Sequence, residues 1–125
     1  MTDAPPPAPG PAAVPPRPTV LVVDDDPSVG RMVRLSLEID GAEVLSAATL
    51  AEGRDLLQPG LSGIVLDRRL PDGDGLELLG PIGTICPDVP VVVYSGLEDG
   101  KEPPTVKRVA KTDIAALFDA LGLSR

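Results

Sequence analysis

The chain has 125 residues, of which 42% are hydrophobic, and a formal net charge of -8, so it has room for one domain with a buried core. The negative charge removes the usual electrostatic driving force for direct binding to nucleic acid or to an anionic membrane. One cysteine, Cys86, and no histidine exclude an internal disulfide and a zinc cage, and the absence of a leader pattern or of an apolar run near ~20 residues favours a cytoplasmic protein.

The first 18 residues are dominated by proline and alanine. Proline fixes φ and removes a backbone donor, and this composition offers little large apolar surface to bury. We interpret residues 1–18 as a disordered or polyproline-like arm, which is more often a spacer than a ligand of SH3-type domains. Residues 19–125 are predicted to form the folded domain.

From Thr19 onward, short apolar runs alternate with helical patterns, which is typical of βαβ units around a parallel sheet. Continuous β-branched runs such as Val20–Val23 are expected in strands that are covered on both faces. The strands predicted in this way are residues 20–23, 43–47, 64–66, 89–94 and 106–110. The sequence therefore predicts an α/β fold.

Two helices are expected in the first half of the domain. Apolar residues recur at helical spacing over residues 29–37, and Gly41 provides a stop. Thr49 and Glu52 form a capping-box pattern that opens the second helix, and Pro59 closes it.

The helices of the second half are less regular in sequence. A third helix starts near Leu76, and Gly80-Pro81 should kink or end it because proline clashes with the preceding turn. Residues 96–105, which contain two glycines and two prolines, are too few for an average helix of ~11 residues with its loops. A fourth helix is therefore predicted to be absent or reduced to a turn, and a last helix over residues 112–121 to follow the fifth strand.

Five residues with reactive or charged side chains follow the predicted strands directly. Asp24 and Asp25 follow the first strand and Asp67 the third, while Ser95 and Lys111 follow the fourth and fifth. In an open α/β sheet, ligands bind outside the carboxyl ends of the strands. Three carboxylates gathered there repel one another unless a cation is present, and Mg²⁺ is the hard divalent ion that prefers such oxygen ligands. The pattern predicts an acidic Mg²⁺ pocket.

Asp67 has the chemistry of a phosphoryl acceptor in such a pocket. A carboxylate is a competent nucleophile toward an activated phosphoryl donor and forms an acyl phosphate. The ammonium of Lys111 can then neutralise the transferred group, and Ser95 can donate a hydrogen bond to it.

Four segments in order, VLVVDDDP, LDRRLPDGDGLELL, VPVVVYSG and AK before a final helix, resemble the receiver domains of two-component response regulators over residues 19–125. The resemblance implies a flavodoxin-like (βα)₅ fold, doubly wound, with strand order 2-1-3-4-5. It also implies that a histidine kinase or a phosphotransfer protein phosphorylates Asp67 in a bacterial signalling pathway. Ser95 would be the switch hydroxyl and Lys111 the invariant lysine of the family.

The same resemblance implies a set of metal ligands. Asp25, Asp67 and the backbone carbonyl of Arg69 would bind Mg²⁺ directly, and Asp24 would act through water. The receiver is expected to be a signalling domain, not an enzyme, apart from slow self-dephosphorylation.

Three features depart from the family pattern, and the first suggests an atypical receiver whose fourth helix is shortened or absent. The first is the short connection over residues 96–105, which we expect to be the output surface. The others are Arg108 at the position that often holds an aromatic switch residue, and Thr112 after the lysine in place of proline. The sequence leaves open the kinase, the oligomeric state, and whether output comes from a further domain, a downstream protein or relay to another carrier.

Two rival functions remain. Asp24, Asp26 and Ser28 give the D-x-D-x-S spacing of haloacid-dehalogenase phosphatases, which would make Asp24 the nucleophile. The other rival is a receiver-fold interaction module that works without phosphorylation.

Some acidic and glycine residues near the pocket have simpler interpretations. Asp26 precedes Pro27 as a helix N-cap would, and Asp72 and Asp74 are expected to be cap or solvated loop charges. Gly73 and Gly75 are interpreted as turn residues.

Overall fold

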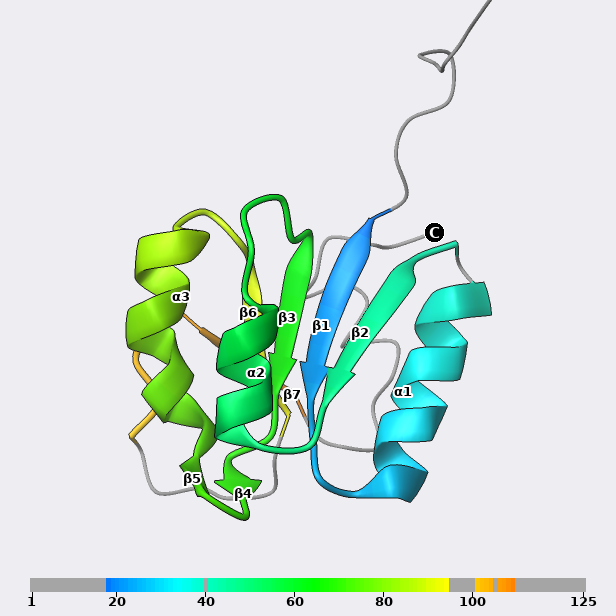
Figure 1. Ribbon diagram of the computed structural model, residues 1–125, viewed down its shortest axis with the longest axis horizontal. Coiled ribbons are helices and arrows are strands. Elements are labelled where there is room, and N and C mark those ends of the chain that lie inside the picture. Colours follow the sequence, from blue (N-terminus) through cyan, green and yellow to red (C-terminus); the bar gives the residue numbers. More distant parts are fainter. Residues whose placement is uncertain (1–17, 40, 95–100, 105, 110–125) are drawn as a thin grey trace, which may run out of the picture.

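Five parallel strands form one sheet in the order β2-β1-β3-β6-β7. The computed structural model describes residues 18–39, 41–94, 101–104 and 106–109. The strands of the sheet are Thr19–Val23 (β1), Glu43–Ala47 (β2), Gly63–Leu66 (β3), Val91–Tyr94 (β6) and Lys107–Val109 (β7). Figure 1 shows the arrowheads of β1, β2 and β3 at the same end of the molecule. In chain order, β6 and β7 are the fourth and fifth strands of this sheet. The predicted α/β fold and the strand order 2-1-3-4-5 are therefore confirmed.

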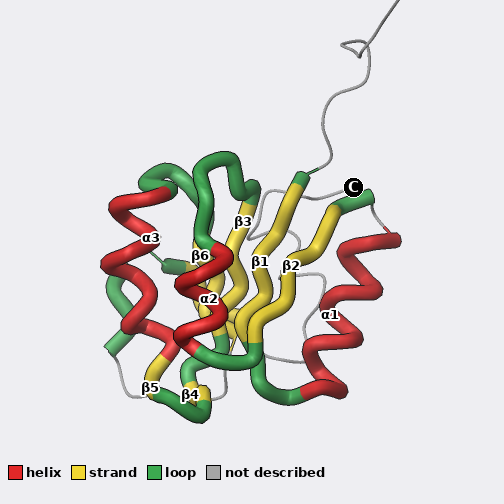
Figure 2. The backbone as a smooth tube through the Cα atoms, viewed as in Figure 1, coloured by secondary structure: helices red, strands yellow, loops and turns green. Residues whose placement is uncertain are grey.

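Helices cover both faces of this sheet. Figure 2 shows the strands between α1 on one side and α2 and α3 on the other. These helices are Pro27–Ile39 (α1), Leu50–Leu56 (α2) and Leu79–Ile85 (α3). Successive residues of a strand face opposite sides, so Val20 and Val22 join the core under α1, while Leu21 and Val23 join the core under α2 and α3.

Side chains cap the first two helices much as their sequences indicate. The Ser28 N–H donates to Asp26 Oδ1 at 2.9 Å, so Asp26 caps α1 as predicted. At α2, Thr49 Oγ1 accepts the Glu52 N–H at 3.1 Å. The Glu52 carboxylate returns to the N–H of Ala48 at 2.7 Å, one residue before the position that a capping box uses.

The third helix does not end at Gly80-Pro81, so the predicted end at this position was wrong. A 3₁₀ turn over Gly75–Leu78 (η1) precedes α3, which then runs to Ile85. Because α3 begins at Leu79, Pro81 lies in its first turn, where backbone N–H groups have no partner within the helix. The expected irregularity of this helix is the 3₁₀ turn, which lies before the proline.

A small antiparallel hairpin, not predicted from the sequence, connects β3 to η1. Its strands Arg69–Leu70 (β4) and Gly73–Asp74 (β5) pair Arg69 with Asp74, and residues 71–72 form the turn. Figure 1 shows the hairpin at the end of the molecule toward which β3 points.

Residues 101–104 and 106, the described part of the connection between β6 and β7, contain no helix. The predicted last helix and arm fall outside the described residues, apart from Pro18. Nowhere in the described part of the chain is a helix long and apolar enough to cross a bilayer.

Candidate acidic site

Three aspartates meet at the carboxyl ends of β1 and β3. Asp24, Asp25 and Asp67 each offer a carboxylate oxygen, and these oxygens lie within 4.8 Å of one another. Asp67 is 3% exposed, whereas Asp24 is half-buried and Asp25 is exposed. The cluster therefore joins one buried acid to two that water can reach.

The sheet itself sets the spacing of this cluster. Val23 pairs with Leu66 in the ladder between β1 and β3, so Asp24 and Asp67 leave neighbouring strands at the same level. The Asp67 N–H donates to Val23 O at 2.8 Å, which carries the ladder one residue past the strand ends.

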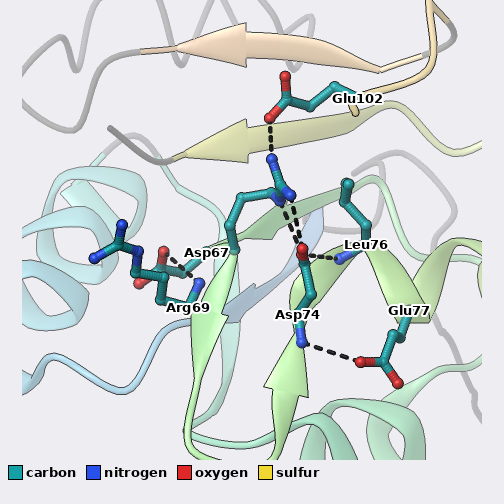
Figure 3. Close-up of polar contacts among 7 residues, drawn as sticks. Asp67, Arg69, Asp74, Leu76, Glu77 and Glu102 are labelled. Atoms are coloured by element: carbon teal, nitrogen blue, oxygen red, sulfur yellow. Dashed lines mark hydrogen bonds and ion pairs between the residues drawn. The ribbon is translucent and has the colours of Figure 1, made fainter. Parts of the chain in front are cut away.

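Backbone amides orient two of the carboxylates. The Asp26 N–H donates to Asp24 Oδ1 at 2.8 Å. The Arg69 N–H donates to Asp67 Oδ1 at 3.3 Å, as Figure 3 shows. Both contacts reach two residues along the chain, so the loops that follow the strands hold the acids in place.

This donor set fits a hard divalent cation. Carboxylate oxygens are the ligands that Mg²⁺ and Ca²⁺ prefer, and the short separations among three acids favour a positive charge between them. Asp24, Asp25 and Asp67 could therefore hold such an ion.

A glycine permits the backbone behind Asp67 to close. A Cβ on Gly75 would lie 2.0 Å from the carbonyl oxygen of Asp67, and the Gly75 N–H donates to Arg68 O at 2.9 Å. Only a residue without a side chain fits this approach. The interpretation of Gly75 as a turn residue missed this requirement, whereas Gly73, with φ +148°, matches a turn role.

Asp72 caps a helix that lies far from it in the sequence. Its Oδ1 accepts the Leu50 N–H at 2.8 Å and its Oδ2 the Ala51 N–H at 3.1 Å, so it binds the start of α2. The hydrogen bond from Leu50 is the largest cause that lowers the pKa of Asp72.

Asp74 caps the 3₁₀ turn that begins after it. Its Oδ1 accepts the Leu76 N–H at 3.0 Å, and the Asp74 N–H donates to Glu77 Oε2 at 3.1 Å (Figure 3). The cap role expected for Asp72 and Asp74 is thus present in the structure.

The sequence interpretation missed Arg68 and Glu102. Arg68 is 2% exposed, and Glu102 pairs with it. A signal for Arg68 exists, because a basic residue two positions after a buried strand, with an acid six residues on, suggests an internal ion pair. Glu102 has no such signal, because nothing local shows what its segment packs against.

The structure describes only some of the other residues that the sequence assigned to the site. Ser95 and Lys111 lie outside the described residues, and the metal-binding role of the Arg69 carbonyl stays a prediction. Arg108 is exposed on β7.

The sequence profile described as the response regulator receiver domain matches residues 20–116. The chain belongs to this family. It is a receiver domain of the kind that two-component response regulators contain, and its fold agrees with that assignment.

Relatives and solved structures agree with the family. The transcriptional regulatory protein PrrA of Mycobacterium tuberculosis is 34% identical over 115 residues, which are 83% of this chain and 49% of PrrA. The non-phosphorylated HemR receiver domain of Leptospira biflexa has a TM-score of 0.76 at 27% identity, covering 87% of this chain and 98% of that one. The structure of a Burkholderia pseudomallei response regulator with a phosphorylated aspartic acid, calcium ion and citrate has a TM-score of 0.74 at 23% identity. The match covers 83% of this chain and 66% of that one.

The receiver spans only part of the relatives that it resembles. The share of their length that is matched is 18% in DctD of Rhizobium meliloti and 34% in KdpE of Escherichia coli.

Proposed function

We propose that this receiver domain accepts a phosphoryl group on Asp67 from a histidine kinase or a histidine phosphotransfer protein. The observation that carries the proposal is the meeting of Asp24, Asp25 and Asp67 at the ends of β1 and β3. The family supports it, as does the phosphorylated aspartic acid in the Burkholderia relative of the same fold.

The proposed step transfers phosphorus from nitrogen to oxygen. A carboxylate oxygen of Asp67 attacks the phosphorus of a phosphohistidine and forms an acyl phosphate. The bond from phosphorus to the imidazole nitrogen breaks, and its electron pair stays with the imidazole, which takes up a proton. The Arg69 N–H, bonded to Asp67 Oδ1, orients the carboxylate for this attack.

The acidic cluster is proposed to hold Mg²⁺. Asp25 and Asp67 would be direct ligands with the Arg69 carbonyl, and Asp24 would act through water. When bound, the ion supplies positive charge that offsets the charge of the phosphoryl oxygens. The Burkholderia response regulator of the same fold contains a calcium ion, which is compatible with a divalent ion in this proposal.

Ser95 and Lys111 complete the proposed site. Lys111 would pair with a phosphoryl oxygen and Ser95 would donate a hydrogen bond to another, so that both residues respond to phosphorylation. The state of Asp67 would then reach an output domain or a downstream partner.

Mass spectrometry of the chain treated with phosphoramidate and Mg²⁺ tests this function. We expect one phosphoryl group, mapped to Asp67 after reduction with borohydride. Asp67→Asn should carry no label, and removal of Mg²⁺ by EDTA should lower the rate of labelling at least about tenfold, because the charge of the group is then poorly offset.

Asp26→Asn is the matched control. It removes a carboxylate from the loop after β1 that carries Asp24 and Asp25, yet asparagine caps helices as well as aspartate, so labelling should be unchanged. A label on Asp24 would instead support the phosphatase alternative. No label on folded wild-type protein would favour the module that works without phosphorylation.

A further inference from the structure

A buried arginine follows the proposed phosphoacceptor directly. Asp67 and Arg68 are the two buried residues with a polar or charged side chain in the described part of the chain. The Arg68 side chain is 1% exposed. A guanidinium is always charged, so its burial costs desolvation free energy unless carboxylates pair with it.

Among the described residues, the carboxylates of Asp74 and Glu102 pair with this guanidinium. Asp74 binds it through two parallel contacts, Nε to Oδ1 at 2.8 Å and Nη2 to Oδ2 at 2.7 Å. Nη1 donates to Glu102 Oε2 at 2.5 Å. Figure 3 shows Asp74 and Glu102 on the other side of the strand end from the Asp67 carboxylate. The ion pairs are therefore separate from the acidic cluster.

The two partners belong to very different parts of the chain. Asp74 is six residues from Arg68 and is already oriented as the cap of η1. Glu102 is 34 residues away, in the connection that leads into β7. Its side chain is 13% exposed, whereas that of Asp74 is 37% exposed, so the Glu102 side chain has less contact with water.

The segment that Glu102 anchors has few other described attachments. β7 pairs through three residues with β6 and lies at the edge of the sheet. Just before it, the Val106 N–H donates to Pro103 O at 3.2 Å, and Val106 packs against the core under α2 and α3. A three-residue edge strand is marginal by itself, so a buried ion pair at its entry matters.

We propose that Arg68 is a positioning residue for phosphorylation. By holding Glu102, it fixes the segment that leads into β7 against the strand end that carries Asp67. This inference rests on the proposed function, because β7 leads in sequence to Lys111, which is assigned to the phosphoryl oxygens. A buried apolar side chain at position 68 would pack the same space but would not hold a carboxylate from a distant segment.

Glu102→Gln in the full chain tests the inference. Arg68 keeps both contacts to Asp74, so the unfolding temperature should change little. Amide exchange of Val106 and of Lys107–Val109, followed by NMR, should become about threefold faster or more, because a charge-assisted hydrogen bond becomes a neutral one. The rate of Asp67 labelling by phosphoramidate should fall by a similar factor.

Two further variants make the result specific. Glu102→Asp keeps the carboxylate and should recover part of both effects. Glu38→Gln removes the carboxylate of the exposed pair with Arg34 on α1 and should leave exchange and labelling unchanged.

The outcomes separate this inference from the proposed function. If wild type is labelled on Asp67 and Glu102→Gln matches it in exchange and rate, the positioning role is overturned while the proposed function stands. A parallel loss of unfolding temperature and labelling, without recovery in Glu102→Asp, would show a general structural role and would also overturn it. Unlabelled wild type overturns both.

Discussion

The two strand ends that carry aspartates use them in different ways. After β1, the acids make local contacts: Asp24 accepts the N–H of Asp26, and Asp26 caps the helix that follows it. After β3, one acid reaches across the fold and another pairs with a buried cation. Asp72 caps α2 from 22 residues away, and Asp74 pairs with the buried guanidinium of Arg68.

The difference shows that the role of an aspartate depends on the donors that surround it. At the first end, these donors are amides of the same loop and of the start of α1. At the second end, Asp72 takes its donors from α2, and Asp74 takes them from Arg68 and from η1, so the hairpin depends on the packing of α2 against it. Substitutions after β3 should therefore destabilise the domain more than matched ones after β1.

The largest expected effect is that of Gly75→Ala. The new Cβ would collide with the Asp67 carbonyl oxygen, and backbone cannot yield as a flexible side chain can, so we expect a loss of about 3 kcal/mol or more in the free energy of unfolding. Urea denaturation measures it.

Gly30→Ala in α1 is the matched control near the first end. Nothing lies within 4 Å of a Cβ there, so the same change should raise the free energy of unfolding by about 0.5–1 kcal/mol, because alanine favours a helix more than glycine does. Equal effects at the two glycines would contradict the close approach behind Asp67.

The next largest effect is the difference in stability between Asp74→Ala and Asp26→Ala. Both remove a cap, but the first also removes the two contacts between Asp74 and the guanidinium of Arg68. Because Asp74 is partly exposed, we expect a loss of about 2 kcal/mol there. For Asp26 we expect about 1 kcal/mol. Thermal unfolding of the two variants gives the difference, and a larger loss at Asp26 would reverse the comparison.

The smallest effect concerns Asp72 and pH. The N–H of Leu50 is the first cause that holds the pKa of Asp72 below its ordinary 3.8. A carboxyl with a lowered folded pKa stabilises the fold above its unfolded pKa and loses that contribution as the pH falls through the folded value. Wild type should therefore lose stability below pH 3.8 more steeply than Asp72→Asn.

Unfolding temperatures measured from neutral to acidic pH test this slope. Asp55→Asn, on the exposed side of α2, serves as a control and should follow the wild-type curve. Parallel curves for wild type and Asp72→Asn would show that the cap contributes nothing that depends on protonation.

Much of the fold was predictable because its signals are local. Strand β2 begins and ends where the apolar pattern predicts, and the cap of α1 follows from Asp26 standing before Pro27. The course of α3 through Pro81 was not predictable, since it depends on where the preceding 3₁₀ turn ends. The β4–β5 hairpin was missed because two-residue strands are too short to show a period.

The sequence by itself determined the α/β fold and the order of acids along it, because strand periodicity and the residues after each strand are local properties. It thereby placed Asp24, Asp25 and Asp67 at one edge of the sheet. Only the tertiary structure decided that Arg68 is buried, that it pairs with Glu102 and that Asp72 caps a distant helix. Those contacts join residues up to 34 positions apart, and their free energy exists only once the chain has packed.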